Sequence, residues 1–167
     1  MRAHVIAVLA LSFVCVGAFA DTKVTLSDVH ICCKSCVDAI VAAGKPSGAT
    51  VTADKETKKV EIVAKDVATA QAAVDALSAA GFLGKSDNKD VVMKPMDVGS
   101  GKATSLDLTT HNCCAKCTKT IDAAAKSAAG VKEVAATPKD PKISVKGEFE
   151  TKDAGKALND AGFQVKK

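Results

Sequence analysis

The chain has 167 residues, a formal net charge of +4, and no tryptophan or tyrosine. Its lysines are scattered and few aromatic side chains accompany them, so a nucleic-acid partner is not expected. The alanine-rich, aromatic-poor composition favours small domains with thin hydrophobic cores. Beyond the first twenty residues no stretch is apolar enough to cross a membrane, so we expect no span in the mature protein.

The first twenty residues have the pattern of a secretory signal peptide. Arg2 supplies a positive start, residues 5–16 form an apolar run, and residues 18–20 are an Ala-Phe-Ala cleavage site. The run is too short to be a comfortable membrane anchor. We therefore predict cleavage after Ala20 and export to the periplasm or the cell exterior. Cleavage would remove Cys15 and leave six cysteines in the mature chain.

The mature chain begins with a predicted strand that leads into a cysteine-rich loop. Thr25, Val29 and Ile31 alternate with more polar positions, as in a half-buried strand. After the loop, apolar residues recur at helical spacing over residues 36–43. Gly44 is the predicted helix stop.

Two further strands, a second helix and a last strand complete this first unit. Residues 51–53 and 59–64 predict two strands joined by a polar turn. Residues 67–77 place apolar side chains on one face of a helix that ends at Gly81. The last strand is expected to begin with Phe82.

The second part of the chain repeats this order at an offset of 81 residues. Its predicted elements are a strand at 106–110, a helix that starts at Cys117 and stops at Gly130, strands at 131–136 and 142–146, a helix over 154–161, and a last strand that begins with Phe163. The recurrence of Leu77, Ala80, Gly81 and Phe82 as Leu158, Ala161, Gly162 and Phe163 is typical of two tandem domains.

Each copy has the order β-α-β-β-α-β, which is that of a ferredoxin-like unit. We predict the α+β class, with two tandem ferredoxin-like domains, each an antiparallel sheet with two helices on one face. The predicted boundaries are residues 1–20 for the signal peptide, 21–96 for the first domain, 97–101 for a flexible linker and 102–167 for the second domain. Residues 91–93 are expected to extend the last strand of the first domain.

The cysteines define the candidate site. The pattern His-x-Cys-Cys-x-x-Cys occurs at residues 30–36 and again at residues 111–117. A Cys-x-x-Cys pair at a helix N-terminus can direct both sulfurs at one centre, where the helix dipole favours thiolates. Two thiolates suit Cu(I). A third sulfur or an imidazole would permit trigonal Cu(I) or a four-ligand Zn(II) site.

The order of strand, Cys-x-x-Cys loop, helix, two strands, helix ending in Gly-Phe and final strand resembles the heavy-metal-associated domain. That family includes copper chaperones and the N-terminal domains of copper-transporting ATPases, and the resemblance covers nearly all of the mature chain. The chain departs from the family pattern in three features. Ile31 and Asn112 stand at the usual methionine position, each loop has an additional cysteine, and each has a histidine where the family often has glycine.

The resemblance implies that each loop supplies two metal ligands. These primary ligands are Cys33 with Cys36 and Cys114 with Cys117. Because adjacent side chains in an extended backbone point apart, Cys32 and Cys113 are conditional ligands. His30 and His111 are candidates for a ligand, a support for a ligand, or an ordinary surface residue. Phe82 and Phe163 are expected in the core, and the resemblance places them near the loops, where they would shield the metal.

These features together predict an exported, non-enzymatic protein that binds heavy metal, Cu(I) in the first place and Zn(II) in the second. It would act as a chaperone or buffer by thiolate exchange, with two metal ions per chain. The expected partners are the metal ion and either a metal-transport protein or another metal-binding domain.

Two alternatives remain at the level of sequence, because Cys-x-x-Cys spacing is shared by metal sites and redox sites. One is a thiol–disulfide redox protein or sensor. The other is a structural or interaction module in which disulfides cross-link the cysteines of an exported protein.

Overall fold

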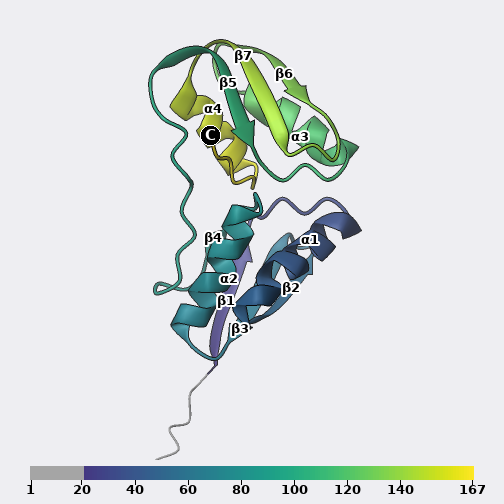
Figure 1. The fold of residues 1–167 in the computed structure, drawn as a ribbon, viewed down its shortest axis with the longest axis vertical. Coiled ribbons are helices and arrows are strands. Elements are labelled where there is room, and N and C mark those ends of the chain that lie inside the picture. Colours follow the sequence, from purple (N-terminus) through teal and green to yellow (C-terminus); the bar gives the residue numbers. More distant parts are fainter. Residues whose placement is uncertain (1–20) are drawn as a thin grey trace, which may run out of the picture.

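The computed structural model describes residues 21–167, and the predicted signal peptide lies outside the described residues. Two antiparallel sheets and four α-helices form an α+β structure, as predicted. Figure 1 shows the N-terminal half (residues 21–96) and the C-terminal half (residues 102–167) one above the other along the long axis. None of the described helices combines the length and the apolar character needed to span a bilayer.

The N-terminal half has one sheet and two packed helices. Its elements are β1 (Thr22–Ser27), α1 (Lys34–Gly44), the 3-10 helix η1 (Lys45–Ser47), β2 (Thr50–Asp54), β3 (Lys59–Ala64), α2 (Val67–Ala79) and β4 (Lys85–Ser86). The strand order is β2-β3-β1-β4, with every neighbouring pair antiparallel. This order fits the predicted ferredoxin-like arrangement.

The C-terminal half has a similar arrangement without a full fourth strand. Its elements are β5 (Lys102–Thr109), α3 (Ala115–Lys126), β6 (Val131–Ala136), β7 (Lys142–Glu150) and α4 (Thr151–Asp160). The strand order is β5-β7-β6, and a single bridge between Thr109 and Lys166 stands beside β5 where β4 stands beside β1. The order of elements predicted for this half is therefore present, with a single bridge in place of the last strand.

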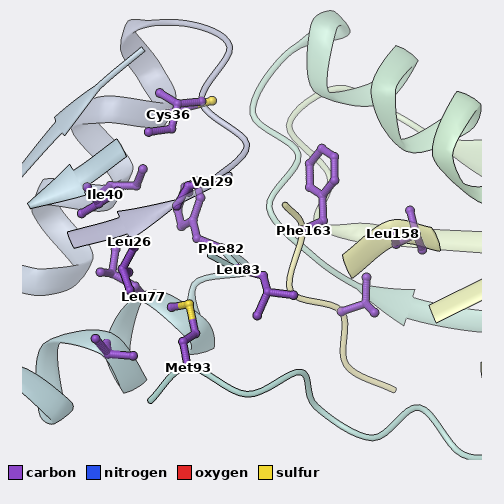
Figure 2. Packing of buried hydrophobic residues seen from close by; sticks show 14 of the residues in the cluster. Leu26, Val29, Cys36, Ile40, Leu77, Phe82, Leu83, Met93, Leu158 and Phe163 are labelled. Atoms are coloured by element: carbon purple, nitrogen blue, oxygen red, sulfur yellow. The ribbon is translucent and has the colours of Figure 1, made fainter. Parts of the chain in front are cut away.

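Buried side chains of the strands and helices form a core that extends into both halves. Val24 and Leu26 of β1 and Ile62 of β3 are buried beneath α1 and α2. Figure 2 shows Cys36 and Phe82 from the N-terminal half, and Phe163 from the C-terminal half, near the boundary between the halves. The packing that forms the core thus also fixes the cysteine loops.

The first strand ends earlier than predicted. The strand ends at Ser27, because Asp28 adopts a left-handed backbone conformation with φ of 60°. Val29 and Ile31 are buried, as expected, but they lie in the loop that follows the strand. The turn at Asp28 redirects the chain toward the C-terminal half before the cysteines begin.

The predicted last strands are also different in the structure. Phe82 and Phe163 form an isolated antiparallel bridge with each other, and the strand that follows Phe82 within the N-terminal half is the two-residue β4. These segments use their backbone groups to join the two halves. Residues 91–93 form no strand, and Val91 and Met93 are instead buried against the N-terminal half.

Gly81 and Gly162 follow the ends of α2 and α4 with left-handed backbones, as predicted, but Gly44 has another role. Gly44 is the last residue of α1 and has an ordinary helical φ, and a Cβ there would lie 2.5 Å from Val51 Cγ2. It allows the close approach of α1 to β2. The chain continues through η1 to Gly48, which has the left-handed conformation of a cap. In the second unit α3 ends at Lys126, before the predicted stop at Gly130.

The strand predicted at residues 142–146 extends to Glu150 as β7. The register with β6 shifts beside Gly147, which has φ of 146°: Val131 pairs with Gly147 and Glu133 with Lys146, so the extra residue is on β6. The segment predicted as a linker is held against α4 in the structure. Thr151 Oγ1 donates a hydrogen bond to the Gly99 carbonyl at 3.0 Å, and the side chain of Val98 packs on Gly155.

Candidate metal centre

Each cysteine loop runs directly into the first turn of a helix. Cys33 is the N-cap residue of α1 and Cys114 is that of α3, both with extended backbone. Cys36 and Cys117 follow inside the helices, so each Cys-x-x-Cys pair brings two sulfurs together at a positive helix end. The sulfurs of Cys33 and Cys36 lie 3.9 Å apart, as do those of Cys114 and Cys117. This local geometry agrees with the sequence prediction.

The two loops meet, and their six sulfurs form a single cluster. The shortest contacts between the halves are 3.5 Å, and they join Cys32 to both Cys114 and Cys117, and Cys36 to Cys113. The Cys36 and Cys117 sulfurs are 3.9 Å apart across the boundary. The six cysteines from Cys32 to Cys117 are all free thiols. The two loops, which were predicted as separate sites, therefore bring their thiols into one cluster.

The additional cysteines belong to this cluster as fully as the expected primary ligands do. The side chains of Cys32 and Cys33 both point into the cluster. Their sulfurs lie 3.5 and 3.8 Å from the sulfur of Cys114. Cys113 contacts Cys33 at 3.7 Å in the same manner. The docking of the two halves gives adjacent cysteines a common set of neighbours, which the pattern within one loop does not reveal.

The histidines lie beside the sulfurs, and each is stacked on a phenylalanine from the other half. His30 stacks on Phe163 and His111 stacks on Phe82, with ring centroids 4.2 Å apart in both pairs. His30 is only 6% exposed, which excludes the surface interpretation for that residue. Phe82 and Phe163 are both buried, so they are core residues that also cover the site.

In both imidazoles the Nε2 nitrogen could bind a metal ion. Their Nε2 atoms are buried and have no hydrogen-bond partner in the protein. Ligand atoms of His111, Cys36, Cys113 and Cys117 lie within 4.8 Å of one another, and those of His30, Cys32 and Cys117 form a second such group. Burial lowers the pKa of His30 to about 4, so its imidazole is neutral near pH 7, as a metal ligand must be.

The cluster concentrates acidic thiols and protonated thiols in one place. A hydrogen bond from the Cys117 thiol lowers the pKa of Cys36, while the same contact raises the pKa of Cys117. Burial raises the pKa of Cys32 to about 12. At Cys114 burial opposes ionisation, but backbone and thiol hydrogen bonds outweigh it and bring the pKa to about 6. A soft cation would replace the shared protons and release them.

Asn112 anchors the second loop by hydrogen bonds where Ile31 anchors the first by burial. Asn112 is 4% exposed, and its Nδ2 donates to the carbonyls of Thr137 and Asp140 at 2.8 and 3.1 Å. Its Oδ1 accepts from the Thr118 hydroxyl at 2.9 Å. The sequence showed the departure from methionine at this position. It did not show the turn between β6 and β7 that the amide would bind.

Replacing Asn112 with alanine is expected to destabilise the reduced protein by about 1–3 kcal/mol, because the buried amide that ties the second loop to the turn between β6 and β7 loses its hydrogen bonds. Urea denaturation followed by circular dichroism measures the change. Asn159→Ala is a matched control, since the Oδ1 of Asn159 is buried in α4 without a partner and its loss should cost little. Equal midpoints for the two variants would contradict the anchoring role.

No family model matches the chain, and no curated protein matches it. Among solved structures, the chain is similar to the solution structure of the N-terminal soluble domains of Bacillus subtilis CopA, with 14% sequence identity and a TM-score of 0.33. The alignment covers 88% of this chain and 93% of that chain.

Proposed function

We propose that this chain is an exported, non-enzymatic protein that binds Cu(I) and buffers it or hands it on by thiolate exchange. The observation that carries the proposal is the convergence of six free thiols, with sulfur–sulfur distances of 3.5–3.9 Å, at the boundary between two similar halves. Sulfurs this close together suit a soft cation that accepts two or three thiolates. The acceptor would be a metal-transport protein or another thiol-bearing metal-binding domain.

The donor set favours copper over zinc. Cys36, Cys113 and Cys117 with His111 are a possible four-ligand Zn(II) set, and this group is the observation that supports zinc as the second candidate. That set leaves three cysteines without a role, whereas Cu(I) can use every sulfur of the cluster. Copper is therefore the proposed cargo.

The exposure of the sulfurs suggests how the ion would enter and leave. Cys36 and Cys117 are 0% exposed, while the other four cysteines of the cluster are partly exposed. A thiolate from a partner can reach an ion through the exposed sulfurs and form its bond before the inner bonds break. Transfer would then proceed by ligand exchange, with no free ion and no change of oxidation state.

The test is competition for Cu(I) between the reduced mature chain, residues 21–167, and a chromophoric Cu(I) chelator. The wild-type chain should retain copper. A Cys33→Ser/Cys114→Ser double variant should retain it at least about tenfold less tightly, because the loss of a direct ligand should exceed the low end of the cost of losing a residue that only supports one. Ser35→Ala, in the same loop but exposed, should match the wild type.

The redox alternative predicts the opposite pattern. A chain purified without reductant would have its thiols paired in disulfides. These disulfides would exchange with model thiol substrates, and the chain would not bind Cu(I). Thiol counting together with metal analysis separates the two. Unchanged copper affinity in the double variant would also count against these cysteines as ligands.

A further inference from the structure

The six sulfurs occupy the corners of a distorted octahedron. In an octahedron each corner has one opposite corner and touches the rest. Among the described sulfurs, the pairs that make no contact across the cluster are Cys32 with Cys113, Cys33 with Cys117 and Cys36 with Cys114, and these take the opposite corners. Two of the remaining edges join sequence neighbours, and all the others are sulfur–sulfur contacts of 3.5–3.9 Å.

Six of the eight triangular faces of this octahedron combine thiols from both halves. Cys36, Cys113 and Cys117 form one triangle with edges of 3.5, 3.7 and 3.9 Å. Cys32 and Cys114 form another with Cys117, with edges of 3.5, 3.5 and 3.9 Å. A triangle of thiolates matches the three-coordinate preference of Cu(I). Neither triangle is available to a single half of the chain.

We propose that the two halves share one polynuclear Cu(I)–thiolate cluster of four ions, in place of two separate ions. The proposal rests on the proposed function for the identity of the metal, and it adds the number of ions and equal roles for Cys32 and Cys113. Four ions with three bonds each require twelve bonds, which six sulfurs supply when each bridges two ions. All copper stays Cu(I), and the six thiols lose their protons to solvent. Four Cu(I) ions and six thiolates give the cluster a net charge of −2.

Hydrogen bonds and ring stacking between the two halves hold the six thiols together. The Gln164 amide donates to the Gly81 carbonyl at 3.0 Å, and the Leu83 amide donates to the Gly162 carbonyl at 3.1 Å. The two phenylalanine–histidine stacks lie across the same boundary. Since the cost of ordering the thiols is met when the protein folds, the ions should enter together, with few partly filled species.

Native mass spectrometry during an anaerobic Cu(I) titration of the reduced mature chain tests the number of ions. We expect a four-ion species to dominate while metal-free chain is still present, and we expect the luminescence typical of clustered Cu(I) thiolates. In a Cys32→Ser/Cys113→Ser variant the maximum should fall from four ions to two or fewer, and the luminescence should disappear. Ser35→Ala should keep four ions.

Other outcomes discriminate between the two proposals. If the wild type and the Cys32→Ser/Cys113→Ser variant both bind two ions independently, the shared cluster is overturned while the proposed function stands. If the wild type retains no Cu(I) against the chelator, both are overturned. X-ray absorption of the loaded wild type gives an answer that needs no variant. Three sulfur neighbours and a short copper–copper distance support the cluster, and the absence of any copper–copper distance overturns it.

Discussion

Replacing Gly81 with alanine is expected to force the two halves of the protein apart and to open the sulfur cluster. Gly81 has φ of 89°, and a Cβ there would collide with the backbone nitrogen of His111 and lie 2.9 Å from the Thr110 carbonyl carbon. Backbone atoms cannot rotate away as a flexible side chain can. We expect a loss of about 3 kcal/mol or more in the free energy of unfolding, from strain at the backbone together with lost packing.

Gly48→Ala is the matched control for this substitution. Gly48 has φ of 81°, close to that of Gly81, but a Cβ there would meet nothing within 4 Å. Its replacement should cost only the strain of a left-handed alanine, about 1–2 kcal/mol. Urea denaturation of both variants measures the difference, and Cu(I) stoichiometry shows whether the cluster survives. Equal losses in the two variants would mean that the contact between Gly81 and the second loop has no energetic role.

A Cys36→Ser/Cys117→Ser double variant is expected to lose Cu(I) binding almost completely. Each of these residues is 0% exposed, and each contacts sulfurs of its own loop and of the other loop. Serine keeps nearly the same size but offers a hard oxygen that suits Cu(I) poorly. We expect the affinity measured by chelator competition to fall at least about a hundredfold, because the loss of a ligand should cost more than the loss of a residue that supports one.

Circular dichroism of this double variant is needed to show that it remains folded. The substitution removes no large side chain, so the helix content should be preserved. The Cys33→Ser/Cys114→Ser variant should have the smaller loss, because its sulfurs lie nearer the surface of the cluster. A reversed order, with the outer pair more important than the inner pair, would refute the assignment of Cys36 and Cys117 as central ligands.

Much of the fold could be predicted from local patterns. The strands predicted at residues 51–53 and 59–64, and the helix predicted from Val67, are present as β2, β3 and α2. The errors lie where a backbone conformation or a contact with another element decides the outcome. Asp28 ends β1 with a left-handed turn, and Gly44 is required by Val51 and not by the helix end. Periodicity contains no information on either.

The candidate site was predicted residue by residue but not as an assembly. The doubled motif identified all six cysteines, and the helix N-termini explained the pairs within each loop. The sequence could not show that Cys32 of one loop would contact Cys114 of the other. It also could not show that Phe163 would cover His30, because an apolar residue after a helix predicts burial without naming the partner.

The reciprocal stacks couple sequence changes in one half of the protein to the other half. The phenylalanine of each half covers the histidine of the other half, so neither half covers its own histidine. A substitution at Phe82 would first change the packing around His111, 29 positions further along the chain, and only then the loop of its own half. A substitution at either phenylalanine should therefore require a compensating substitution in the opposite half.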